Sequence, residues 1–416
     1  MKLLNCILAI LLSSNVAYGA HLSELQKTAL ENRKVIEKYK TNLEKSDDVE
    51  SIAKSGYYPS LDLGYTATML DEDSLFEQKE NSVAYGAVSW NIFAGFRDKY
   101  SIRSAQLLSN AEAFKLQGIE QDIKLNVALR YLSIYHNQAN LKVSEDSYAT
   151  LSKMHEDAKN RFEVGLIKKN ELLKFKVDLD NAEITRKKAR AGVDKSVFLL
   201  QREIDTTVNL DELTFHEFTE LPKLAGHGEY EAEMLSSNSS IQLLKETIEA
   251  SELGIKAEKS RYYPSLDLKS SYQKYDDDYI IGSGNSPSEE IRTQLVLSMN
   301  IFDGFGKKSR VNKATLETRT LRYDLEELSR DLTTGLKNLY LDYQVSSSNV
   351  IVSESSIEQA EENLRITRLS YEEGLAKESD LLDAISNLSR AKYNFVAAKS
   401  EVYDTYFKII RSAEGL

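Results

Sequence analysis

Residues 57–63 read Tyr-Tyr-Pro-Ser-Leu-Asp-Leu, and residues 262–268 repeat the same residues in the same order. A second pair of stretches follows the first, since Asn-Ile-Phe-Ala-Gly-Phe at 91–96 matches Asn-Ile-Phe-Asp-Gly-Phe at 300–305. Both matches have a spacing of about 205 to 209 residues, which is typical of a duplicated unit rather than of chance. Each half of the chain is therefore expected to build the same succession of elements.

A third pair of stretches keeps this order. Phe-Glu-Val-Gly-Leu at 162–166 corresponds to Tyr-Glu-Glu-Gly-Leu at 371–375. We expect a first repeat at 20–205, an equatorial joining segment at 206–230 and a second repeat at 231–416.

The first 19 residues have the pattern of a secretory signal peptide. Lys2 precedes an apolar run, and small residues precede a cleavage point before Ala20. The chain is therefore expected to be exported. Its only cysteine, Cys6, lies in this segment, so the mature chain would contain no disulfide and no thiolate metal site.

Composition and motifs disfavour several classes of function. The net charge of -12 is unlike that of a nucleic-acid-binding protein, which needs clustered cations. No enzyme motif is found: Gly304 and Gly306 before Lys307 lack the remaining residues of a phosphate loop, and the histidines lack the spacing of metal ligands. The acidic stretch that begins at Asp276 fits an exposed loop better than a calcium site. We therefore expect no catalysis, no cofactor, no metal and no nucleic acid partner.

Four segments alternate apolar and polar residues with the period of a β-strand. They lie at about 61–69, 83–93, 266–272 and 291–301. The longer ones suit a tilted bilayer crossing, and the aromatic residues at their ends suit a membrane interface. A soluble sandwich with aromatic corners is the alternative.

The remaining segments have helical periodicity, and two of them are very long. A helix of about 60 residues extends roughly 90 Å, which no compact domain requires. Each long helix is expected to turn at a glycine, Gly165 or Gly374, and to be followed by a returning helix. The predicted helices span 23–55, 99–162, 170–204, 231–260, 307–370 and 379–411.

Four strands are too few to close a membrane barrel within one chain. Three copies would supply about twelve, and closure removes the strand edges that lipid does not tolerate. The alternative is a periplasmic or surface coiled-coil scaffold without a pore, which leaves the amphipathic strands unexplained.

The order of helix, strand pair, long helix, glycine turn and returning helix, present twice, resembles the TolC-type family of outer-membrane efflux and secretion proteins. The resemblance covers essentially the whole mature chain. It implies an α+β membrane protein with long α-helical coiled-coil hairpins and four transmembrane strands per chain, which trimerises into a 12-stranded barrel on an α-helical tunnel. It also implies a passive channel in contact with outer-membrane lipid and extending into the periplasm. The partners would be a periplasmic adaptor and an inner-membrane ABC or RND-type pump, for type I protein secretion or multidrug efflux.

The resemblance also assigns site residues, which lie near the two glycine turns. Asp380 and Asp383 match acidic rings of a closable aperture, and their spacing of three places them on one helix face. Three copies would bring six carboxylates into a narrow ring that favours cations. The alternative is that both acids simply stabilise the start of a helix.

Further matches concern the latch and the tips. Tyr371 and Glu171 match polar residues that latch neighbouring helices. The family's latch arginine is Ala376 here, and whether the adjacent Lys377 substitutes for it stays open. The turn residues expected to contact the adaptor are Gly165, Leu166, Gly374 and Leu375.

Overall fold

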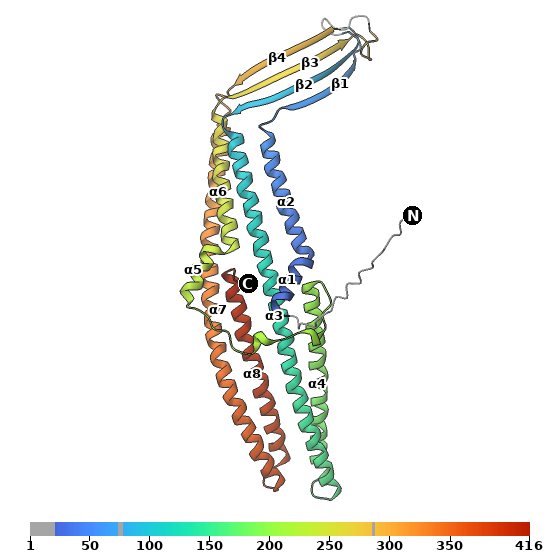
Figure 1. Cartoon of the computed structure of the whole chain (residues 1–416), viewed down its shortest axis with the longest axis vertical. Coiled ribbons are helices and arrows are strands. Elements are labelled where there is room, and N and C mark those ends of the chain that lie inside the picture. Colours follow the sequence, from blue (N-terminus) through green and yellow to red (C-terminus); the bar gives the residue numbers. More distant parts are fainter. Residues whose placement is uncertain (1–20, 74–77, 285–287) are drawn as a thin grey trace, which may run out of the picture. The chain divides into compact units, whose positions relative to one another are not determined.

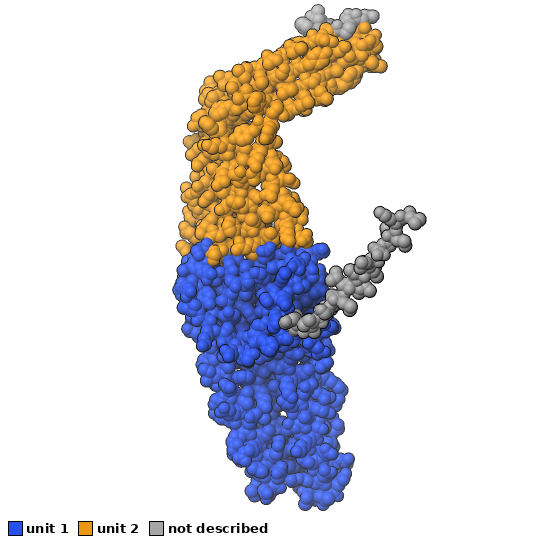
Figure 2. Space-filling model, in the orientation of Figure 1, with its two compact units in different colours: residues 1–36, 119–236, 332–416 blue, residues 37–118, 237–331 orange. Residues whose placement is uncertain are grey.

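The computed structural model describes residues 21–73, 78–284 and 288–416. The expected signal peptide lies outside these residues. The chain forms two compact units, which Figure 2 distinguishes by colour. Unit 1 comprises residues 1–36, of which those from 21 are described, with 119–236 and 332–416, and unit 2 comprises 37–118 and 237–331.

Helices dominate the described chain, together with four strands (Figure 1), which confirms the α+β class. The boundaries 20–205, 206–230 and 231–416 expected for the sequence repeats remain a prediction. The helices are α1 Leu22–Asn32, α2 Lys34–Ser55, α3 Arg97–Glu163, α4 Lys169–Ile204, α5 His227–Ser237, α6 Ser239–Lys259, α7 Gly306–Glu372 and α8 Glu378–Ser412. Short 3-10 turns are η1 Leu210–Glu212, η2 His216–Phe218 and η3 Ser260–Tyr262. The strands are β1 Ser60–Met69, β2 Glu80–Ala94, β3 Ser265–Asp276 and β4 Ser288–Ser298.

The strands form one antiparallel sheet in unit 2, in the order β1-β2-β3-β4. The two repeats meet at its centre, where Trp90 of β2 pairs with Leu268 of β3. The outer strands β1 and β4 expose apolar side chains, with Leu63 80% and Leu297 71% exposed. The alternation predicted from the sequence therefore produces a sheet whose apolar surface is not covered by the described chain.

The repeated Asn-Ile-Phe-x-Gly-Phe stretches adopt the same turn in both repeats. Gly95 and Phe96 have φ values of 64° and 69°, and Gly304 and Phe305 have 65° and 69°. In each copy the two phenylalanines meet edge to face, with ring centroids 5.1 Å apart for Phe93 and Phe96 and 5.5 Å apart for Phe302 and Phe305. Similar sequence thus gives similar conformation at both strand-to-helix junctions.

Three elements differ from the sequence-based expectation. The first predicted helix is broken at Arg33, whose extended backbone lets its guanidinium pair with the buried carboxylate of Glu203 at 2.8 Å. The helix expected from 231 to 260 is interrupted at Asn238, whose side chain caps α6 by accepting from the amides of Ser240 and Ile241. The last strand ends at Ser298 rather than near residue 301.

Unit 1 contains two helical hairpins, formed by the C-terminal part of α3 with α4 and by the C-terminal part of α7 with α8. The joining segment is anchored on them by aromatic side chains, since Phe218 packs against Tyr131 of α3 and Tyr403 of α8 with centroids 5.5 Å and 4.8 Å apart. Near the hairpin ends the four helices share one buried core. It contains Leu151, Met154, Ala158, Phe175, Leu364, Leu381, Ala384 and Ile385.

Candidate functional site at the hairpin tips

Both hairpins turn through a glycine with a left-handed backbone. Gly165 has a φ of 78° and Gly374 a φ of 75°, values that side chains with a Cβ rarely adopt. In each turn the residue after the glycine donates its amide back into the last helical turn, Leu166 to Arg161 O and Leu375 to Ser370 O, both at 2.8 Å. These are the bonds of a Schellman cap, so both turns are specified locally by the sequence.

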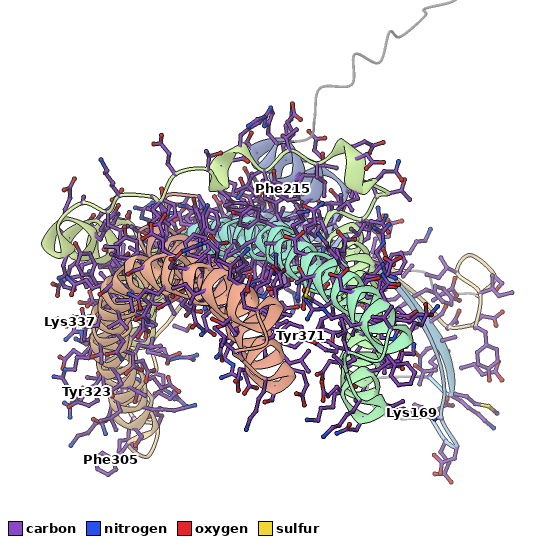
Figure 3. All side chains as sticks on the ribbon, turned by 90° about the horizontal axis from the view of Figure 1, so that it is seen from below. Lys169, Phe215, Phe305, Tyr323, Lys337 and Tyr371 are labelled. Atoms are coloured by element: carbon purple, nitrogen blue, oxygen red, sulfur yellow. The ribbon has the colours of Figure 1, made fainter. Side chains whose placement is uncertain are left out.

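The leucines at both tips have no cover within the described residues. Leu166 is 74% and Leu375 85% exposed. Figure 3 labels Tyr371 near the end of α7 and Lys169 at the start of α4, which flank these turns. Each tip therefore presents an apolar side chain on a rigid turn.

An ion pair links the two hairpins close to their tips. Lys174 on α4 donates to the carboxylate of Glu378 at the start of α8. The pairing raises the pKa of Lys174 and lowers that of Glu378. Neither residue was singled out from the sequence.

Tyr371 lies where both hairpins meet. Its ring contacts Phe175 of α4 edge to face, and the Arg161 guanidinium of α3 lies 5.2 Å from its centroid. Burial is the main cause that raises the pKa of Tyr371, and the charge of Glu171 acts in the same direction. The hydroxyl is buried without a hydrogen-bond partner among the described residues. The structure thus brings Tyr371 and Glu171 into one environment, and the nearby cation is Arg161.

Asp380 and Asp383 both lie in the first turns of α8 but in different surroundings. The Asp380 carboxylate accepts the amide of Lys377 at 3.1 Å, and so satisfies a free donor of the helix start. Asp383 faces Asp178 of α4. The pKa of Asp178 is raised by burial and by the charge of Asp383.

The two facing aspartates open onto a cavity of about 350 Å³ between α3, α4 and α8, whose lining is partly apolar, with Leu151, Leu382 and Ile385, and partly polar. Its wall contains a carboxamide and several hydroxyls, which suit contact with water. These groups come from Ser144, Ser147, Asn181, Thr185, Ser386, Ser389 and Tyr393.

The presence of Lys174 and Asp178 at the hairpin tips could have been predicted from their spacing in the sequence. They follow Glu171 at intervals of three and four, so all three share one face of α4. That face is the counterpart of the one carrying Asp380 and Asp383 on α8. No pattern within one chain segment, however, shows which residue of another segment it will meet.

The family model described as Outer membrane efflux protein matches residues 25–202 and 232–412. Among the described residues, no helix combines the length and the apolar character needed to cross a membrane.

Two curated relatives are similar over much of the chain. TolC, an outer membrane protein of Vibrio cholerae, is 20% identical over 408 residues, which span 92% of this chain and 90% of TolC. The alkaline protease secretion protein AprF of Pseudomonas aeruginosa is 21% identical over 313 residues, which span 72% of this chain and 64% of AprF. This chain thus spans slightly less than two thirds of the length of AprF.

Solved structures share the fold. VceC, an outer membrane protein of Vibrio cholerae, superposes with a TM-score of 0.81 at 14% identity, covering 95% of this chain and 96% of VceC. The outer membrane channel CmeC of Campylobacter jejuni gives 0.80 at 14% identity, covering 95% and 85%.

Proposed function

The chain belongs to the outer membrane efflux protein family, and on that basis we propose that it is a passive trimeric channel-tunnel for export across the periplasm and outer membrane. Membership in this family of outer-membrane channels places the chain in the outer membrane. The relative AprF is named for protein secretion, and the family is named for efflux.

The open sheet is the observation that carries the proposal. Its outer strands β1 and β4 present apolar side chains and one unpaired backbone edge each within the described chain. An unpaired edge in lipid costs several kcal/mol for each unsatisfied group. Three copies, each contributing four strands, would pair all edges in a twelve-stranded wall.

The hairpin tips are proposed as the gate. In a trimer, Asp380 and Asp383 would line the aperture and favour cations. The buried Tyr371 hydroxyl would receive a partner from a neighbouring helix near Glu171. Ala376 occupies the position of the family's latch arginine, and Arg161 would take over the role of that arginine. Lys377 is then not required as a substitute, because the Arg161 guanidinium already lies 5.2 Å from the centroid of the Tyr371 ring.

Partners are proposed from the same tips. The turns with Gly165, Leu166, Gly374 and Leu375 would contact a periplasmic adaptor, since exposed apolar side chains on rigid turns are suited to docking. An inner-membrane ABC or RND-type pump would supply the energy, and no catalysis is assigned to this chain.

Two experiments test this function. Purified protein in planar bilayers should form long-lived cation-selective channels, and protein that gives no conductance would contradict the proposal. A deletion strain then separates the two kinds of cargo: loss of a secreted protein from the medium indicates type I secretion, whereas increased drug sensitivity indicates efflux.

A further inference from the structure

A pocket of about 300 Å³ in unit 2 is lined by cationic side chains. Its lining residues come from the ends of β2 and β4, from η3 and from the starts of α3, β3 and α7. Figure 1 labels these strands and α-helices, which meet where the sheet joins the helices. Four cations line it, whereas Asp303 is the one carboxylate among the lining residues described. The cations are Arg97, Arg261, Lys307 and Arg310.

Lys307 is the most deeply buried of these cations, with 7% of its surface exposed. Its Nζ donates to the carbonyl of Asn300 and lies 5.5 Å from the centroid of the Tyr262 ring. An ammonium group has three donors, and a buried cation is costly unless an anion compensates it. In the part of the chain that the structure describes, no ion pair of Lys307 is found. The buried ammonium therefore keeps donors and charge for an anionic group.

The arginines at the rim are only partly neutralised. Arg310 pairs with Asp303 at 2.7 Å, and Arg261 pairs with Glu258 at 2.8 Å. A guanidinium has five donors, so each retains several that can point to a ligand. Arg97 pairs with Asp98 at 3.4 Å. Four cations thus face three carboxylates, and the pocket keeps a net positive charge.

The first repeat lacks the equivalents of three of these cations at its own strand-to-helix junction. Both junctions use the same Gly-Phe turn, so the turn itself does not require the cations. By the spacing of the matched stretches, the positions equivalent to Arg261, Lys307 and Arg310 are Gly56, Asp98 and Ser101. Three of the four cations are therefore specific to the second repeat, whereas Arg97 comes from the first.

The rim of the pocket also has an apolar side. Tyr262, Tyr263, Phe302 and Phe305 are all exposed around this junction. Exposed aromatic side chains next to lipid-facing strands are typical of a membrane interface, and basic pockets at that depth bind anionic headgroups. Phosphate oxygens match both guanidinium and ammonium donors.

We propose that this pocket binds the phosphate of an anionic phospholipid headgroup in the periplasmic leaflet of the outer membrane. Lys307 contacts the phosphate from the buried side, the arginines contact it from the rim, and the exposed aromatic rings lie along the acyl chains. The inference rests on the proposed placement of the sheet in that membrane.

Native mass spectrometry of the full mature protein in detergent tests the proposal by titration with phosphatidylglycerol. We expect saturable binding, weakened about tenfold by Lys307→Met and by Arg310→Ser, the latter restoring the residue of the first repeat. The matched control is Lys308→Met, which removes the same charge from an exposed neighbour and should bind as the unaltered protein does. Arg310 is exposed, so Arg310→Ser keeps the test valid if Lys307→Met does not fold.

Three results would overturn the proposal: equal affinity in all variants, an equal loss in Lys308→Met, or full displacement of the lipid by millimolar inorganic phosphate. Diacylglycerol, which lacks the phosphate, should not bind. Conducting trimers that bind no phosphatidylglycerol would refute this inference alone, whereas absence of conducting trimers would refute the proposed function.

Discussion

Lys174 of α4 and Glu378 of α8 form an ion pair that joins the tips of the two helical hairpins of one chain. The Glu378 side chain is 12% exposed and that of Lys174 51%. The carboxylate is thus largely covered while the ammonium remains in contact with solvent. The pair restrains the returning helices, which are the elements that would move if the tips opened.

Replacing Lys174 with Ala should loosen the tips. We expect the open-state population of single channels to rise about two- to fivefold, as is usual for loss of a partly exposed ion pair. Lys176→Ala is the matched control, because Lys176 pairs with Asp180 within α4 and not between hairpins. An equal effect of both changes would contradict a specific role for the Lys174–Glu378 pair.

Tyr371 allows the ring and the hydroxyl to be tested separately. Tyr371→Ala removes packing against Phe175 and should lower the stability by about 2 kcal/mol, less than for a fully buried aromatic residue. Tyr371→Phe should leave the melting temperature unchanged but raise the open-state population, because the hydroxyl has no partner among the described residues and is proposed to reach a neighbouring copy. Closed channels in the phenylalanine variant would argue against the latch.

The acidic ring predicts a change in ion selectivity. Asp380→Asn with Asp383→Asn should reduce the cation preference several-fold in reversal-potential measurements, because the charges proposed to line the aperture are lost. The amide at position 380 can still cap α8, so the helix start is preserved. Glu354→Gln removes a charge from an exposed residue about five turns before the end of α7 and should have no effect. Unchanged selectivity in the double variant would remove the ring from the mechanism.

The aspartates facing each other across α4 and α8 predict a pH response. The pKa of Asp178 is raised from 3.8 by burial and by the charge of Asp383, which shows that the folded tip disfavours the charged form of Asp178. As the pH falls through this raised pKa, Asp178 takes up a proton and the repulsion is relieved. The tips should therefore pack more tightly and open less often at acidic pH.

Asp178→Asn should remove the part of this response that falls between pH 7 and 4.5. The Lys174–Glu378 pair does not interfere there, because the pKa of Glu378 is lowered from 4.5 and the pair is lost only below that value. Single-channel recordings over this range measure the effect. An identical acid response in the variant would show that another group is responsible.

The conformation of the glycine turn predicts that substituting Gly374 and substituting Gly335 change the stability of the protein in opposite directions. Gly374→Ala should cost about 1 kcal/mol, because the residue has a positive φ although its surroundings are open. Gly335→Ala, within α7 and equally open, should instead stabilise by about 1 kcal/mol. Thermal unfolding of both variants gives the comparison, and shifts of the same sign would contradict it.

The sequence was informative wherever the information is local. The alternation around Leu63 predicts β1, and the glycines at 165 and 374 predict both turns, because period and backbone freedom are properties of one segment. The break at Arg33 could not be predicted, since it depends on Glu203, which lies 170 positions away. The Lys174–Glu378 pair could not be predicted for the same reason, because its two residues lie on different segments of the chain.

In the candidate site, too, local features could be predicted from the sequence and contacts between segments could not. Asp380 was assigned through the family resemblance, but its bond to the Lys377 amide and the position of Asp383 opposite Asp178 depend on how α8 packs. The roles of these residues in gating remain proposals.

Electron microscopy of the full-length protein extracted from outer membranes tests the central claim most directly, because end-on views show both stoichiometry and a lumen. Our account predicts threefold-symmetric rings with a central opening and a wall to which every chain contributes four strands. Single chains, or assemblies without a lumen, would contradict it.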